Sequence, residues 1–198
     1  MKRFTTIALL AVILCGTATL LAQQTPPSST LTQPRASPHD AINVRAGGGR
    51  GAPLVTIYYG RPNAKSPTNG EVRKIWGVLV PWGQVWRLGA DEATTLITQK
   101  DLQFGDVAVP AGAYTLCMLP VEDGPSKLII NKAIGQWGIP YTPALQQQEL
   151  GRVDLTKEPD VDKSVDQLTL SMSNANGETT LKITWEKSVY SVKFKVKQ

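Results

Sequence analysis

Three runs near the C-terminus alternate between apolar and polar side chains, and this alternation constrains the fold more than any other feature of the chain. In residues 168–173, 181–186 and 192–197, every second residue is apolar and the residues between are polar or charged. A period of two with one apolar face is typical of antiparallel strands that cover a core on one side and face water on the other. Asn176-Gly177 separates the first two runs and favours a hairpin turn.

We therefore expect an antiparallel meander at this end of the chain, made of residues 168–174, 178–185 and 189–196. Leu170, Ile183 and Phe194 should face the core, because each falls on the apolar side of its run. The lysines of the last run should lie on the solvent face, where exposed lysines also discourage edge-to-edge pairing.

The rest of the chain also has strand character and little helical periodicity. Runs rich in β-branched and aromatic residues favour strands over residues 41–46, 52–59, 94–100, 107–112, 114–119 and 127–131. The glycine-rich residues 47–51 lack the Gly-Lys-Ser/Thr ending of a phosphate loop and read as a loose hairpin connection. Thr142-Pro143 resembles an N-cap followed by proline, so residues 142–150 could form one or two helical turns. The fold class that this pattern predicts is all-β, an antiparallel β-sandwich or jelly-roll-like domain with little helix.

The N-terminus has the pattern of a secretory signal peptide. Lys2 and Arg3 precede an uncharged apolar or small-residue stretch that ends at Ala22. Residues 23–38 are rich in Pro, Ser, Thr and Gln and predict a flexible tether. We expect residues 1–22 to be removed, residues 39–198 to form a single domain, and the protein to be periplasmic or secreted. No other stretch is long enough to span a bilayer.

Composition excludes several classes of function. Loss of Lys2 and Arg3 with the signal peptide reduces the formal net charge from +5 to +3, which is too mild for nucleic-acid binding through bulk charge. Cys117 would then be the only cysteine and lies in an apolar run, so we expect a buried, inert thiol. His39 is the only histidine, and its place at the end of the tether predicts an exposed linker residue. We expect no metal, no cofactor and no catalytic triad.

Residues 60–93 depart from simple alternation and hold the candidate site. Three of the five tryptophans and three of the eight arginines fall there, in segments broken by Pro and Gly. Arginine forks grip carboxylates or phosphates, and tryptophan faces stack on sugars or cations. The same residues could instead fill the loop as a hydrophobic plug whose arginines pair with acids. The candidate ligand-binding residues are Arg61, Arg73, Trp82, Trp86, Arg87, Asp91 and Glu92.

A sharper hypothesis is that Arg61, Arg73, Arg87 and Glu92 converge on one polar cluster between Trp82 and Trp86. Three guanidinium groups against one or two carboxylates would leave positive charge unpaired. Such a site favours an anionic or hydroxyl-rich ligand.

Five segments of the chain resemble the uncharacterised bacterial family catalogued as domain of unknown function 2911. The resemblance covers roughly Pro38 to the C-terminus and implies export, a single domain and a β-rich fold, with no activity attached. The family pattern typically has Asn at the position of Asp91, so this chain has a carboxylate in place of an amide. The segments that carry the resemblance are residues 60–62, 75–83, 85–94, 110–116 and 136–138.

Three functions remain open at this point. The first is an exported, non-catalytic module that binds a small polar, anionic or carbohydrate ligand. The second is a structural or envelope-assembly domain without a ligand. The third is a hydrolase that uses Glu92 with Asp91 or another carboxylate. Asp91 and Glu92 can pair only at a turn or bulge, because neighbouring strand residues point to opposite faces. The ligand and the oligomeric state are not readable from the sequence.

Overall fold

The computed structural model describes residues 35–197, and in this range the chain forms two packed antiparallel sheets. The predicted signal peptide and most of the predicted tether lie outside the described residues. One sheet has the order β1-β2-β3-β6-β7-β8. Its strands are β1 (His39–Arg45), β2 (Leu54–Gly60), β3 (Thr95–Thr98), β6 (Gly112–Leu119), β7 (Lys127–Asn131) and β8 (Glu149–Asp154).

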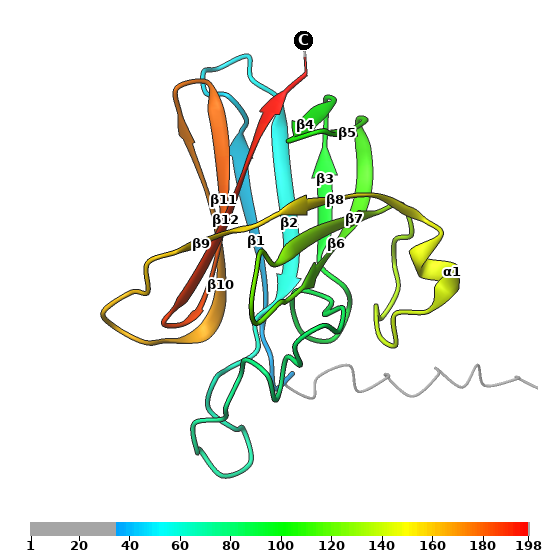
Figure 1. The fold of residues 1–198 in the computed structure, drawn as a ribbon. Helices are drawn as coiled ribbons and strands as arrows, with labels where there is room; N and C mark the ends of the chain where they lie inside the picture. The colour runs from blue at the N-terminus through cyan, green and yellow to red at the C-terminus, as the bar shows by residue number, and fades with distance from the viewer. Residues whose placement is uncertain (1–34, 198) are drawn as a thin grey trace, which may run out of the picture. The chain divides into compact units, whose positions relative to one another are not determined.

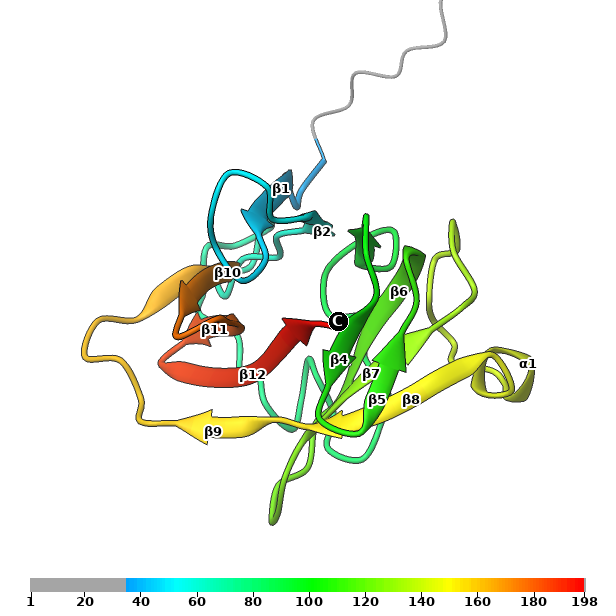
Figure 2. The same cartoon turned by 90° about the horizontal axis from the view of Figure 1, so that it is seen from above.

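The second sheet has the order β10-β11-β12-β4-β5, and β9 pairs with β12 beside this path. Its strands are β10 (Val165–Ala175), β11 (Glu178–Glu186), β12 (Ser188–Val196), β4 (Leu102–Phe104), β5 (Val107–Val109) and β9 (Thr156–Glu158). In Figures 1 and 2, β8 and β9 follow one another as a nearly continuous stretch that passes from one sheet to the other. The all-β sandwich predicted from the sequence is confirmed.

The predicted C-terminal meander is confirmed, both in the order of its strands and in the side of each strand that faces the core. Leu170 pairs with Ile183, and Ile183 pairs with Tyr190 across the next strand. Leu170, Ile183 and Phe194 are each 2% exposed or less. Asn176 and Gly177 both have positive φ, 52° and 79°, as a tight two-residue hairpin turn requires.

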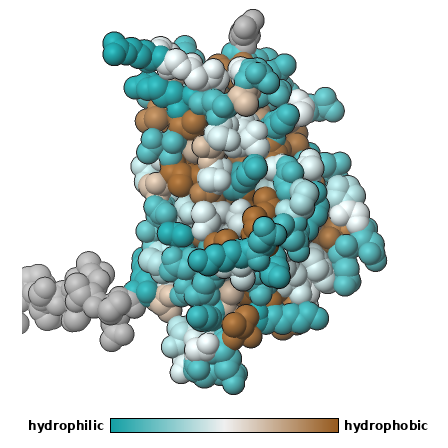
Figure 3. Space-filling view, turned by 90° about the vertical axis from the view of Figure 1, so that its left-hand side faces the viewer, coloured by the Kyte–Doolittle hydropathy of each residue, from teal (hydrophilic) through white to brown (hydrophobic). Residues whose placement is uncertain are grey.

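The core lies between the sheets and contains side chains from both. Phe104 and Phe194 stack with ring centroids 4.6 Å apart, which joins β4 to the apolar face of β12. On the surface, hydrophobic residues lie in small groups separated by hydrophilic ones on the face shown in Figure 3. The apolar residues of each alternating strand thus face the core, and the polar residues between them face solvent.

The single helix within residues 35–197, α1 (Pro143–Gln146), begins where the sequence predicts. Thr142 is its N-cap and accepts a hydrogen bond from the backbone N–H of Leu145. The helix is one turn long, and Glu149 and Leu150 already belong to β8. Within the described residues no helix has the length and apolar character to cross a membrane.

The sequence assigns residues 35–38 to a flexible tether, but the structure places them against the domain. Pro38 accepts a hydrogen bond from the backbone N–H of Arg61, and Ala36 accepts one from the side chain of Asn63. His39 is the first residue of β1 and pairs with Gly60, so it is a strand residue rather than a linker residue. The folded unit therefore includes residues on the N-terminal side of His39.

The burial of Ile183 gives a direct test of the strand register. We expect Ile183→Ala to lower the free energy of unfolding by about 2–5 kcal/mol, because it leaves a cavity between the sheets. Lys182→Ala, on the exposed side of the same strand, should change it by no more than roughly 0.5 kcal/mol. Urea unfolding of both variants measures the difference, and equal losses would show that the register is wrong.

Cys117 gives a chemical test of the core. It is fully buried, and this burial raises the pKa of its thiol to about 12. Because the thiolate is the reactive form, we expect no reaction with a disulfide reagent near neutral pH until the protein unfolds. Reaction of the native protein as fast as that of the denatured protein would contradict this expectation.

Candidate functional site

The long connection between β2 and β3, residues 61–94, lies at one end of the sandwich and is tied to both sheets (Figure 1). The backbone of Trp86 exchanges two hydrogen bonds with Met118 of β6, with N···O distances of 2.7 and 2.8 Å. The ring of Trp86 stacks on Trp185 of β11, with centroids 5.6 Å apart. Trp86 therefore fixes the middle of the connection against both layers.

Two further tryptophans extend this stack. Trp76 meets Trp86 edge-on at 6.2 Å and Trp185 edge-on at 6.5 Å. Trp82 stacks on Trp76 at 6.0 Å. Trp82 thus packs within the loop and does not line either lobe of the hollow described next. Trp76 and Trp82 therefore fill the connection as a hydrophobic plug, which is the structural alternative that the sequence leaves open.

A hollow with two lobes adjoins this stack. The lobes have volumes of about 580 and 360 Å³ and share Leu79, Trp86 and Ile139. In the larger lobe the charged group is already paired, because Arg152 donates two hydrogen bonds to Glu149 at 2.7 and 2.8 Å. This pairing lowers the pKa of Glu149 and leaves the larger lobe without a free cation among the described residues.

The smaller lobe contains four of the predicted site residues, namely Arg73, Trp86, Arg87 and Asp91. Arg87 distinguishes it from the larger lobe. The Nε and Nη1 atoms of Arg87 are buried and have no hydrogen-bond acceptor among the described residues. Burial lowers the pKa of this guanidinium, against the attraction of Asp91 and Glu92.

A second loop supplies one side of the Arg87 environment. The ring of Trp137 lies 5.3 Å from the guanidinium carbon, in a cation–π arrangement. Gly138 makes this approach possible, because a Cβ there would lie 2.8 Å from the Cβ of Ala93 and 3.0 Å from that of Arg87. Arg87 is therefore enclosed by packing and has unused donors.

The predicted convergence of Arg61, Arg73, Arg87 and Glu92 on one cluster is wrong. Arg61 instead joins β2 to β10, donating to the carbonyl of Leu168 at 3.1 Å and to Thr169 at 3.2 Å. Its remaining nitrogen lies 3.4 Å from Asp40. A backbone carbonyl, a threonine hydroxyl and an acid therefore satisfy this guanidinium away from the smaller lobe.

The other two members also have partners of their own. Arg73 donates to the backbone carbonyls of Asn63 and Ala64, although it still lines the smaller lobe. Glu92 points to the N-terminal segment, where Arg35 donates to both of its carboxylate oxygens. The hydrogen bond with Arg35 is the main cause that lowers the pKa of Glu92 to about 2.

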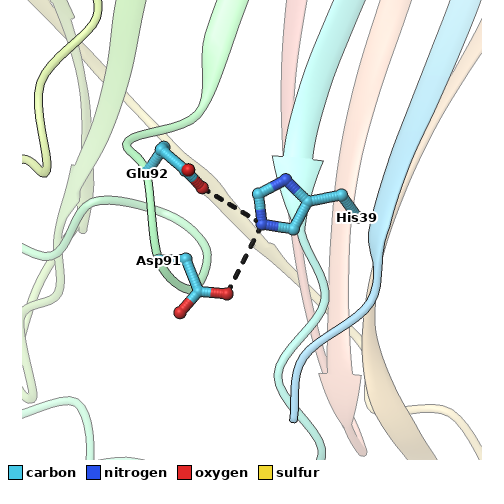
Figure 4. Close-up of side chains that lie close together, drawn as sticks. All are labelled: His39, Asp91 and Glu92. Atoms are coloured by element: carbon cyan, nitrogen blue, oxygen red, sulfur yellow. Dashed lines mark ion pairs between the residues drawn. The ribbon is translucent and has the colours of Figure 1, made fainter. Parts of the chain in front are cut away.

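Asp91 and Glu92 converge because the chain turns between them. Asp91 has a φ of +61°, outside the strand region, so the two neighbouring side chains no longer point to opposite faces. Figure 4 shows both carboxylates directed at the ring of His39. The Nε2 atom of His39 lies 3.5 Å from an oxygen of Asp91 and 3.3 Å from an oxygen of Glu92.

Gly60 allows Asp91 to lie close to His39, although the two residues are 52 positions apart in the sequence. It is the strand partner of His39, and a Cβ at this position would lie 2.2 Å from the carbonyl oxygen of Ala90. Only glycine therefore lets the loop around residue 90 lie against the end of β2 beside His39.

Sequence reasoning missed four residues near the site: Arg35, His39, Trp137 and Trp185. The signal for His39 was weak, because it requires the pairing of β1 with β2 and the close contact at Gly60. Trp137 fell in a short segment without periodicity, and Trp185 was expected only as a core residue of its strand. All four residues lie outside residues 60–93, so their positions in the sequence do not indicate that they lie near the site.

The fold and the site define an all-β sandwich with a polar pocket among the loops at one end. The chain belongs to the family described as "Protein of unknown function (DUF2911)", whose model matches residues 37–194. The resemblance inferred from the sequence is thereby confirmed. No curated protein and no solved structure matches the chain.

The contact at Gly60 can be tested by adding a single methyl group. We expect Gly60→Ala to lower the free energy of unfolding by about 1–3 kcal/mol or more, because the new Cβ would overlap the backbone of Ala90. Gly51→Ala is the matched control, since a Cβ there meets no atom within 4 Å. Chemical denaturation measures both variants, and a neutral Gly60→Ala would show that the loop does not lie against β2.

Proposed function

We propose that the protein is an exported, non-catalytic module that binds a small anionic or hydroxyl-rich molecule in the smaller lobe. The observation that carries the proposal is Arg87, whose buried Nε and Nη1 atoms meet no acceptor among the described residues. A buried guanidinium is costly unless its donors are satisfied. Arg87 also lines the lobe, and a carboxylate, a phosphate or a pair of hydroxyl groups is the natural partner of a guanidinium there.

The other walls of the lobe fit the same class of ligand. Arg73 adds a second positive charge, while Asp91 is the acidic residue among those that line the lobe. Trp86, which is half-buried, supplies apolar surface at the lobe against which a sugar ring or another planar group can pack. A volume of about 360 Å³ is at the small end of known ligand sites, so the ligand should be the size of an organic acid or a sugar phosphate.

Export is the second part of the proposal and rests on the sequence of residues 1–22. A positive start followed by an uncharged apolar stretch is the pattern of a secretory signal peptide.

The two alternative functions have less support. A purely structural loop would pair each arginine with an acid inside it, yet the Nε and Nη1 atoms of Arg87 have no such hydrogen bond within residues 35–197. A hydrolase based on Asp91 and Glu92 needs one carboxylic acid with a raised pKa. Glu92 has the opposite shift, because Arg35 stabilises its charged form.

The test begins with a thermal-shift screen against organic acids, sugar phosphates, nucleotides and sugars, since a ligand of the folded state raises the melting temperature. With the best compound, Arg87→Met should reduce affinity at least tenfold, about 1.4 kcal/mol. Its stability without ligand should stay equal or rise, because the substitution removes buried donors that lack partners.

Arg50→Met is the control, since it removes the same charge from an exposed position in the β1–β2 connection. It should leave affinity unchanged. Unchanged affinity in Arg87→Met, together with a loss of several kcal/mol in stability, would show that Arg87 is structural and would overturn the proposal.

A further inference from the structure

A second group of side chains lies beside the pocket, and its members are the types that bind metal ions. The ring nitrogen of His39 and the carboxylate oxygens of Asp91 and Glu92 all lie within 4.8 Å of one another. They come from the start of β1 and from the β2–β3 connection, and they point to one place (Figure 4). All three side chains are accessible, with 37%, 30% and 47% of their surface exposed.

The spacing of these atoms matches a tetrahedral centre. Zinc holds imidazole nitrogen and carboxylate oxygen at about 2.0–2.2 Å, so two ligand atoms at a tetrahedral angle lie roughly 3.4 Å apart. The His39 nitrogen is 3.5 Å from the Asp91 oxygen and 3.3 Å from the Glu92 oxygen.

Arg35 is an independent sign that this place attracts a cation. Its Nη1 atom lies 2.5 Å from Glu92, 2.8 Å from His39 and 3.7 Å from Asp91, so one cationic nitrogen approaches all three side chains. Arginine only donates hydrogen bonds, so the Nε2 atom of His39 must accept. The Nε2 atom of His39 therefore faces the same point as the carboxylate oxygens of Asp91 and Glu92.

Arg35 balances the cluster only in part. The two carboxylates carry two negative charges, and the guanidinium supplies one positive charge and no hydrogen bond to Asp91 at 3.7 Å. Arg87 is the other cation that acts on both carboxylates, from the neighbouring lobe. A divalent ion would neutralise Asp91 and Glu92 directly and would form bonds to all three side chains.

We propose that His39, Asp91 and Glu92 form a binding site for a divalent cation of the zinc class, and that Arg35 occupies this site when the metal is absent. One imidazole with two carboxylates suits zinc or a similar transition metal better than magnesium or calcium, which prefer all-oxygen sites. Three protein ligands leave a fourth position for water or for a ligand group. Asp91 also lines the smaller lobe, so the metal would lie at its edge.

Isothermal titration of the metal-free protein with Zn²⁺ tests the proposal. We expect saturable binding of one ion per chain, and we expect Co²⁺ to give the intense visible absorption of a tetrahedral site. His39→Gln and Glu92→Gln should each weaken Zn²⁺ binding at least tenfold. Arg35→Gln should strengthen it several-fold, because this substitution removes the competing cation.

Asp160→Asn is the matched control, since it removes another exposed carboxylate that forms an ion pair. It should leave Zn²⁺ affinity unchanged. Thermal unfolding without metal checks that each variant is folded. Three results would overturn the proposal: no saturable Zn²⁺ binding, equal affinity in folded His39→Gln, or weaker binding in Arg35→Gln. Tighter binding of Mg²⁺ or Ca²⁺ than of Zn²⁺ would overturn the assignment of the metal class.

Discussion

Trp86 is the residue on which the arrangement of the functional end depends. Its backbone pairs with Met118 of one sheet while its ring stacks on Trp185 of the other, so a single residue joins the loop to both layers. Its indole N–H also donates to the carbonyl of Gly89, which fixes the turn that follows. Such a loop is held by packing on two sides and can present Arg87 in one position.

This anchoring explains why an unpaired guanidinium can persist beside the core. Arg87 is the next residue after Trp86, and its guanidinium carbon lies 5.3 Å from the ring of Trp137. A binding group that is held in place before the ligand arrives loses little freedom on binding, and this raises affinity without additional contacts. The packing around Trp86 and Trp137 therefore holds Arg87 in a position where two of its donors have no acceptor among the described residues.

The sheets could be predicted from the sequence because their signal is local. Alternation at Leu168, Leu170 and Met172 places a strand and its core face without knowledge of any other segment. The site could be predicted only in part. Arg73, Trp86, Arg87 and Asp91 do line one lobe, but the partners of Arg61 lie on β10, more than 100 positions away. The cluster of His39, Asp91 and Glu92 forms only because β1 pairs with β2 and because Gly60 has no side chain. Neither fact can be read from the spacing of residues in the sequence.

The position of Arg35 means that the functional unit and the family match have different boundaries. The family model begins at residue 37, whereas Arg35 contacts Glu92 and His39 from the segment before it. A chain that began at the first matched residue would keep every strand and would expose two carboxylates that normally share a guanidinium. Measurements on such a shortened chain would describe a different electrostatic state from that of the longer protein. The residue at which an expressed chain begins therefore changes the charge beside Asp91 and Glu92.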